Sequence, residues 1–303
     1  MRILIIDQLH HKNRIGIELL FQYMKIDYVF VNDISKIDST FDIIYSPSNA
    51  IDTSKYPPSQ RFIFGPHFSV FPDNKLKAIK NNNDNSVYIQ PSEWCVDLWK
   101  GLGVTQFLPI QYFPFPVDVE KFCPANKFSP ANKFCPVVPS NKREKVFIYF
   151  KRRRQDELSF VMHFLKNRQI EFEVFNYVAR YDEKHYLDFL RHAKFGIVLG
   201  AHESQGFAVE EALSCDVPLL VWNVRSLNQE VGCNYANLPA TTIGYWDGRC
   251  GEYFYEAKEL EKTFELFMGK IQTYRPREFI LEQLSVEPCA KRFMELFLPL
   301  QSH

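Results

Sequence analysis

Residues 195–222 carry the pattern that most restricts the fold of this chain. The apolar run 195–199 predicts a buried parallel strand, and the run 219–222 predicts another. Between them, a segment from residue 204 onwards has helical character, and Pro218 prevents that helix from continuing. A strand, a tight turn, a helix and a second strand are typical of a parallel α/β sheet.

The predicted helix has a polar start and a defined end. Ser204 is predicted as its N-cap, and Asp216 can occupy the left-handed conformation that ends it. Two carboxylates flank the start, because Glu203 precedes the helix and Glu211 lies about two turns inside it. Since the first N–H groups of a helix are unpaired, this unit can bind an anion.

The two carboxylates have two interpretations. Acidic residues near a helix start stabilise it through the helix dipole, which accounts for Glu210 and for Glu203 but not for Glu211. Alternatively, the helix N-terminus binds a phosphate while Glu203 and Glu211 accept hydrogen bonds from hydroxyl groups on either side. A nucleoside-diphosphate sugar has that order of parts: ribose, diphosphate, hexose. Spacing alone leaves both interpretations open.

The first half of the chain alternates short apolar runs with helical or polar segments. Strands are predicted at 2–7, 27–32, 41–45, 61–64 and 86–90, and helices at 17–23 and 93–100. Residues 8–14 are predicted as a polar turn that leads through Gly16 into the first helix. This alternation is typical of an open parallel sheet with helices on both faces. Because no G-x-G-x-x-G follows the first strand, a dinucleotide site is not expected there.

The second half repeats the pattern after a proline-rich stretch. Strands are predicted at 145–150 and 171–175, with helices at 155–167, 182–192 and 286–298. We therefore expect an N-terminal Rossmann-like domain at 1–120 and a linker at 121–143, which contains a near-duplicated hexapeptide. A C-terminal Rossmann-like domain follows at 144–285, and a helix at 286–303 is expected to pack back toward the N-terminal domain.

Composition narrows the classes of function. The chain has 303 residues, enough for two domains, and its 36 basic and 36 acidic residues cancel, which argues against nucleic-acid binding. Seven cysteines without CxxC spacing favour a reducing compartment over disulfides or a metal site. Since no apolar window approaches the ~20 residues of a membrane span and no signal sequence opens the chain, we expect a cytoplasmic protein.

Two motifs resemble those of one enzyme family. Glu203-x7-Glu211, with Gly206 between them, resembles the E-x7-E motif of retaining glycosyltransferases with the GT-B fold, family 4 type. Residues 117–124 resemble the linker motif V-D-x-x-[RK]-F-x-P of the same family. The resemblance implies a GT-B fold, with two Rossmann-like, doubly wound parallel-sheet domains facing a cleft. It also implies that the N-terminal domain (1–120) binds the acceptor and that the C-terminal domain (144–285) binds the donor.

The resemblance also implies roles for individual residues. Glu203 would bind sugar hydroxyls, Glu211 the ribose, and the backbone around Gly206 the distal phosphate. The residues implied as catalytic are Glu203, His67 and Lys151, and those implied as donor-binding are Arg152, Gln205, Gly206, Phe207, Glu211 and Gly16. The sequence departs from the family at Asp216, where glycine is usual, and has one glycine in the first loop, where a second is common.

A basic run, residues 151–154, ends the strand predicted at 145–150. It has two interpretations, a solvated charge run or a diphosphate site. Family members place an Arg and a Lys on the diphosphate here, although their Arg-x4-Lys spacing is absent from this chain. We expect Lys151 and Arg152 to stabilise the leaving diphosphate, so that neither a metal nor another cofactor is needed.

His67 follows the strand predicted at 61–64. A lone histidine in such a place often stabilises a loop, but the resemblance implies a contact with the donor sugar near its reacting carbon. The predicted function is transfer of a sugar from a nucleoside-diphosphate sugar to the hydroxyl of a glycan or glycoconjugate, with retention. The alternatives are a non-catalytic nucleotide-sugar-binding protein and a GT-B epimerase. The epimerase needs further carboxylates in the first domain, where Asp7 is the one candidate.

Overall fold

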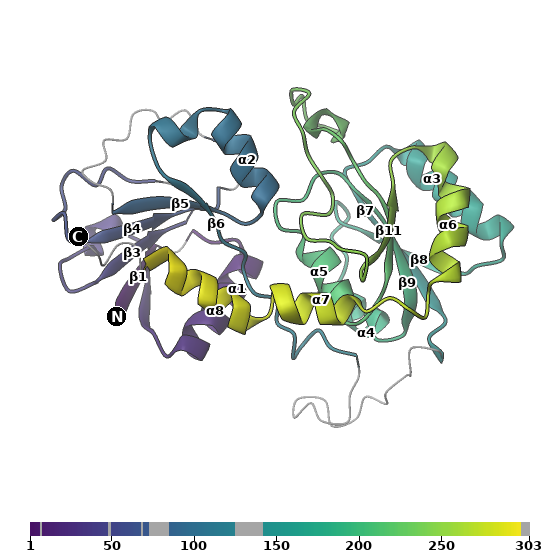
Figure 1. Ribbon diagram of the computed structural model, residues 1–303, viewed down its shortest axis with the longest axis horizontal. Coiled ribbons are helices and arrows are strands. Elements are labelled where there is room, and N and C mark those ends of the chain that lie inside the picture. Colours follow the sequence, from purple (N-terminus) through teal and green to yellow (C-terminus); the bar gives the residue numbers. More distant parts are fainter. Residues whose placement is uncertain (7, 48–49, 68, 73–84, 125–141, 298–303) are drawn as a thin grey trace. The chain divides into compact units, whose positions relative to one another are not determined.

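The structure is a computed structural model that describes residues 1–303 except 7, 48–49, 68, 73–84, 125–141 and 298–303. The chain divides into two compact units (Figure 1). One comprises Met1–Pro116 together with Leu284–His303, and the other comprises Val117–Gln283. The duplicated hexapeptide of the predicted linker falls mostly outside the described residues.

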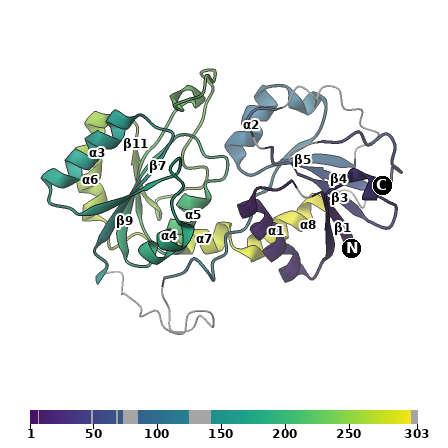
Figure 2. The same ribbon diagram turned by 180° about the vertical axis from the view of Figure 1, so that it is seen from behind.

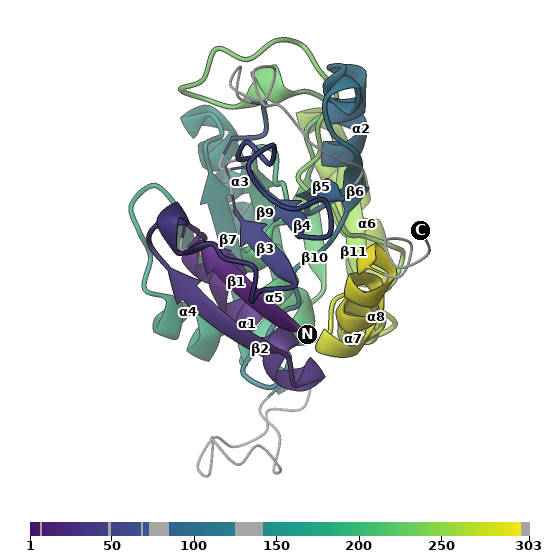
Figure 3. The ribbon, with the colours of Figure 1, turned by 90° about the vertical axis from the view of Figure 1, so that its left-hand side faces the viewer.

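The first unit is built on a parallel sheet of six strands in the order β2-β1-β3-β4-β5-β6, and several of these lie side by side in Figure 3. Its strands are β1 Arg2–Ile6, β2 Asp27–Val31, β3 Ile43–Ser46, β4 Arg61–Phe64, β5 Ser86–Gln90 and β6 Ile110–Tyr112. Its helices are α1 His11–Met24, α2 Glu93–Gly101 and α8 Val286–Phe297, with short helical turns at Ile34–Lys36 and Val104–Gln106. The predicted strands of this half are confirmed.

The C-terminal helix α8 supplies part of the core of the first unit. It packs beside α1 (Figures 1 and 2). The Phe293 ring is buried, with its centroid 5.2 Å from that of Phe21 on α1 and 5.8 Å from that of Phe113. The last helix of the chain therefore completes a core that the first residues of the chain begin.

Helix α1 begins six residues earlier than predicted. The predicted polar turn at 8–14 is wrong, since the helix starts at His11 and the His10 side chain accepts a hydrogen bond from the backbone N–H of Lys12 at 3.4 Å. The polar residues of this first turn are exposed at His11 and partly exposed at 12–14. Gly16 lies inside the helix, where a Cβ atom would stand 3.1 Å from Phe115 Cβ and from the carbonyl oxygen of Pro116.

The second unit contains a parallel sheet of five strands in the order β11-β10-β9-β7-β8. Its strands are β7 Lys145–Lys151, β8 Phe172–Asn176, β9 Ala193–Gly200, β10 Leu219–Trp222 and β11 Gly251–Phe254. Its helices are α3 Gln155–Asn167, α4 Glu183–Leu190, α5 Phe207–Ser214, α6 Leu260–Gly269 and α7 Pro276–Gln283, with short helical turns at Leu227–Gln229 and Ala257–Glu259. The sequence did not predict β11 or α7.

Side chains of β7 alternate between the two faces of this sheet. Ile148 joins a core with residues of α3 and α6, which lie on the same face in Figures 1 and 2. Phe147 points the other way, and its ring meets Phe175, Tyr186 and Phe189 at centroid distances of 6.2, 5.7 and 6.3 Å. Helix α4 supplies the last two of these rings, so both faces of the sheet are covered.

The helix after β9 is shorter than predicted. Its N-cap is Gly206, with a left-handed φ of 96°, so the predicted cap at Ser204 is wrong. Residues 204 and 205 belong to the loop, because the turn into the helix needs a left-handed residue and Gly206 is the one that adopts this conformation without strain. The left-handed Asp216 is confirmed, with φ 60°.

Candidate functional site

The second sheet changes direction between β7 and β9. From β7 the chain passes to β8 on one side, and it then returns to β9 on the other side. In open parallel sheets, ligands bind beyond the carboxyl ends of the two strands at such a point. Here those ends are Lys151 of β7 and Gly200 of β9, which are paired in register.

A lysine and a glutamate meet at this edge. Lys151 Nζ lies 2.7 Å from Glu203 Oε2, and their side chains are 20% and 8% exposed. The ammonium also stands 4.5 Å from the centre of the Tyr177 ring. The backbone fixes both residues, since Ala201 N–H donates to the Lys151 carbonyl and Glu203 N–H to the Thr241 carbonyl, each at 3.0 Å. Two residues predicted as catalytic are thus in direct contact.

The N-terminus of α5 follows at once. Gln205 is buried before it, and its Nε2 donates to Glu210 Oε2 at 3.2 Å. Gly206 packs closely on Glu203, whose Cβ would lie 3.3 Å from a Cβ at position 206. Phe207 is the first helical residue. The glutamate, the glycine and the helix start therefore form one continuous segment at the edge of the sheet.

Glu211 lies on α5 and is 3% exposed. Burial raises the pKa of Tyr181 well above its usual range, and the nearby carboxylate of Glu211 raises it further. In the same way, burial and then Glu203 raise the pKa of Tyr149. Both carboxylates of the E-x7-E pattern are therefore close to tyrosine side chains on the same part of the second unit.

Arg152 has a different partner from Lys151. Its guanidinium binds the carboxylate of Glu230, a residue that the sequence analysis missed. Glu230 Oε2 also lies 2.8 Å from Nδ1 of His202. Burial alone would raise the pKa of Glu230, but hydrogen bonds from His202 and Arg152 outweigh burial and lower it to about 2. The sequence signal for Glu230 is weak, since it is one acid in a loop far from both partners.

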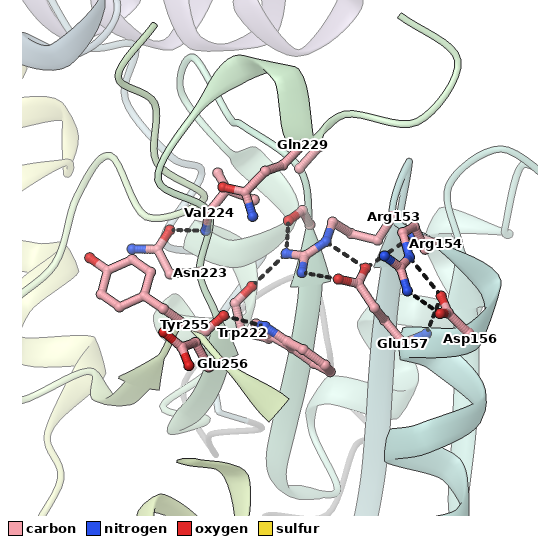
Figure 4. A network of polar contacts seen from close by, with 12 residues as sticks. Arg153, Arg154, Asp156, Glu157, Trp222, Asn223, Val224, Gln229, Tyr255 and Glu256 are labelled. Carbon is pink, nitrogen blue, oxygen red and sulfur yellow. Dashed lines mark hydrogen bonds and ion pairs between the residues drawn. The ribbon is translucent and has the colours of Figure 1, made fainter. Parts of the chain in front are cut away.

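Arg153 and Arg154 have local structural roles (Figure 4). The Arg153 side chain is 1% exposed and donates to the carbonyls of Gly200 and Trp222, at 3.2 and 2.9 Å, as well as to Glu157. It thereby joins the carboxyl ends of β9 and β10 to the start of α3. Arg154 pairs with the exposed Asp156.

The loop after β10 lies against the end of β9. Asn223 Oδ1 accepts hydrogen bonds from the N–H groups of Val224 and Thr242, both at 2.8 Å (Figure 4 shows the first). Thr242 packs on Gly200, where a Cβ atom would lie 2.8 Å from Thr242 Cγ2. A glycine at the end of β9 therefore permits this loop to approach the Lys151–Glu203 pair.

The two other predicted site residues, His67 and Gly16, lie in the first unit. His67 follows β4 and a cis peptide bond between Gly65 and Pro66. Its Nδ1 is 3.1 Å from both the backbone N and the carbonyl O of Ser69, and its ring lies 6.2 Å from that of Trp99. Gly16 lies in α1, where it packs closely on Phe115 and Pro116.

Among the described residues, no three His, Cys, Asp or Glu side chains gather where they could hold a metal ion. Nor is any helix among the described residues long and apolar enough to cross a membrane.

At the carboxyl ends of its strands, the second unit has an ammonium group, a helix N-terminus and two buried carboxylates. These groups suit an anion that carries hydroxyl groups.

Comparisons with known proteins bear on the fold. No family model matches the sequence, and no curated protein matches it. The structure is similar to sucrose-phosphate synthase from Thermosynechococcus elongatus, with a TM-score of 0.57 at 11% identity over 100% of this chain and 99% of that one. It is also similar to a glycosyltransferase from Rickettsia africae, with a TM-score of 0.58 at 10% identity over 100% and 98% of the two chains.

A third similar structure is the catalytic domain of starch synthase IV from Arabidopsis thaliana, bound to ADP and acarbose. Its TM-score is 0.51 at 12% identity, over 96% of this chain and 76% of that one. Identities this low show the fold alone. With two parallel-sheet α/β units of six and five strands, the chain has the GT-B fold that its motifs predicted.

Proposed function

We propose that this protein is a retaining glycosyltransferase that moves a sugar from a nucleoside-diphosphate sugar to a hydroxyl group of a glycan or glycoconjugate. The observation that carries the proposal is the contact between Lys151 and Glu203 at the switch point of the second sheet. The pair joins a cation suited to a diphosphate and a carboxylate suited to sugar hydroxyls. Similarity of fold to a glycosyltransferase, to sucrose-phosphate synthase and to starch synthase IV supports it.

Each group at the edge has a role in this proposal. Lys151 and the N–H groups at the start of α5 stabilise the negative charge that develops on the leaving diphosphate, with Arg152 nearby. Glu203 and the backbone around Gln205–Phe207 orient the sugar and the distal phosphate, and Glu211 binds the ribose. His67 and Gly16 keep in this proposal the roles that the family resemblance implies, contact with the donor sugar and donor binding. Because the protein supplies positive charge itself, the reaction is expected to proceed without a metal.

The proposed compartment is the cytoplasm. The six described cysteines all carry free thiols, and Cys95, Cys215, Cys250 and Cys289 are buried. Burial raises the pKa of Cys95 and of Cys250 to about 12, so these thiols are protonated and unreactive at neutral pH. Such thiols suit a reducing environment.

A non-catalytic nucleotide-sugar-binding protein is the second candidate. One observation favours it: Lys151 and Arg152 are each engaged by a carboxylate of the same unit. A diphosphate must compete with Glu203 and Glu230 for these cations, which weakens the charge available for catalysis. The two candidates differ in turnover, not in binding.

The test is a thermal-shift screen against UDP-, GDP-, ADP- and dTDP-sugars, followed by donor hydrolysis with the one that stabilises the protein. We expect Lys151→Ala to lower turnover about 100-fold, because it removes a charged group that stabilises the leaving group. Glu203→Ala should abolish turnover while the protein stays folded. Lys145→Ala, at the opposite end of the same strand, is the matched control and should behave as wild type.

The outcomes separate the candidates. Turnover that persists in the presence of EDTA is expected. Binding of one donor with no hydrolysis or transfer would favour the non-catalytic protein. No stabilisation by any of the four sugars, or full turnover by Glu203→Ala, would contradict the proposed function.

A further inference from the structure

Glu230 is a buried carboxylate that contacts three side chains at once. It directly follows the helical turn Leu227–Gln229, and its side chain is 4% exposed. One oxygen binds the guanidinium of Arg152, and the other lies 2.8 Å from Nδ1 of His202. The thiol of Cys233 donates to the first oxygen at 3.3 Å. Both oxygens of Glu230 are therefore engaged.

Two of these partners, Arg152 and His202, are the sequence neighbours of the proposed catalytic pair. Arg152 directly follows Lys151 at the end of β7, and His202 directly precedes Glu203 beyond the end of β9. One carboxylate from the loop after β10 thus joins the ends of two other strands. A contact between two side chains of the same strand end would not connect β7 and β9 in this way.

Backbone contacts reinforce this connection. The N–H of Val231 donates to the Arg152 carbonyl at 2.9 Å, and the N–H of Ala201 donates to the Lys151 carbonyl at 3.0 Å. Arg152 has a left-handed φ of 51°, which is unfavourable for a side chain of this kind and persists where surrounding contacts hold it. Its salt bridge with Glu230 and the bond from Val231 are such contacts.

We propose that Glu230 is a positioning residue, which sets the distance and direction of Lys151 and Glu203 for a nucleoside diphosphate without touching that ligand. The inference rests on the proposed function, since it assigns Glu230 to the same site. Its charge is suited to the role: with a pKa of about 2, Glu230 stays ionised at neutral pH and can hold a cation continuously.

The first measurement needs no ligand. Amide hydrogen exchange by NMR is compared between wild type and Glu230→Gln, which keeps the shape of the side chain and removes its charge. We expect faster exchange at both Ala201 and Val231, whose N–H groups bind the carbonyls of Lys151 and Arg152. Glu252→Gln is the matched control. Glu252 is a partly buried acid on β11 of the same unit, and its Oε1 lies 2.9 Å from Nζ of Lys270. It should leave both amides unchanged.

The second measurement is calorimetric titration with UDP, GDP, ADP and dTDP. The diphosphate that wild type binds best should bind Glu230→Gln about 10- to 100-fold more weakly, since small displacements of positioned groups have effects of this size. Glu252→Gln should bind it as wild type does. Arg152→Ala, which removes one of the two connections, is expected to fall between wild type and Glu230→Gln.

The outcomes are distinct. Unchanged exchange at Ala201 and Val231 overturns the inference, whatever the affinity. Faster exchange with unchanged affinity overturns it too, because Glu230 would then have a merely structural role. If wild type binds none of the four diphosphates, the proposed function fails, and the role assigned to Glu230 at that site is overturned with it.

Discussion

At the scale of single residues, Glu210 is a buried acid that forms no ion pair among the described residues. It is 1% exposed, and one of its oxygens accepts from Gln205, while the other has no hydrogen-bond partner among the described residues. Burial raises the pKa of Glu210 well above its usual value, and the nearby carboxylates of Glu211 and Glu203 raise it further, against the effect of the Gln205 hydrogen bond. The side chain is therefore protonated well above the pH at which an exposed glutamate ionises.

This protonation predicts a pH dependence of stability. Because the pKa is higher in the folded state, the stabilising contribution is complete below the unfolded value near 4.5 and is lost as the pH rises toward the folded value. Glu210→Gln keeps the Gln205 contact and cannot ionise. As the pH rises from the unfolded pKa toward the folded one, the free energy of unfolding of the variant should increase relative to that of wild type, by at most about 1.4 kcal/mol per pH unit. Urea unfolding at several pH values measures this, and parallel profiles would contradict it.

At the scale of elements, the segment 117–122 is fastened to the second unit by side chains that lie far away in the sequence. The Arg277 guanidinium of α7 donates to the carbonyls of Phe122, Ser214 and Val119, at 3.1, 2.6 and 3.2 Å. Ser214 at the end of α5 donates to the Phe122 carbonyl at 2.5 Å. The residues that resemble a family linker motif are thus held against α5, the helix that carries Glu211.

Loss of this anchor should expose the segment. Arg277→Ala leaves three carbonyls without their charged donor, and we expect a loss of about 2–4 kcal/mol in the free energy of unfolding. Cleavage by trypsin after Lys121 should become faster, which limited proteolysis can follow. The control is Arg275→Ala, an exposed arginine whose side chain binds only the nearby carbonyls of Gln272 and Tyr274 among the described residues. Equal cleavage rates in both variants would refute the anchor.

At the scale of the whole molecule, the chain returns to its first unit at the end. Helix α8 follows the complete second unit and buries Phe293 against Phe21 and Phe113, so the first core needs both ends of the chain. Phe293→Ala should destabilise the first unit by about 3–5 kcal/mol through the cavity it leaves. Calorimetry should show a lower transition for this unit and little change in that of the second. Met294→Ala is the control, because Met294 is 40% exposed on the same helix. If Phe293→Ala lowered the transitions of both units equally, the assignment of α8 to the first unit would be contradicted.

Apolar runs and helix signals determined most of the fold at the level of sequence. The runs at 145–150, 195–199 and 219–222 are strands because uninterrupted apolar segments of this length are buried on both faces of a parallel sheet. Tertiary contacts decided where some elements begin. The loop before α5 continues to Gly206 because the turn needs a left-handed residue. The edge strand β11 escaped prediction because Tyr253 within it is exposed and its pattern is weak.

For the candidate site, local sequence patterns placed the carboxyl ends of β7 and β9 to within one residue and singled out Lys151, Glu203 and Glu211. How their charges are paired follows from tertiary contacts. Lys151 meets Glu203 across 52 positions of sequence, and Arg152 meets Glu230 across 78. Such pairs depend on strand order and loop path, because the sheet brings together residues that no local pattern connects. A spacing motif can therefore name Glu203, while the fold alone pairs it with Lys151.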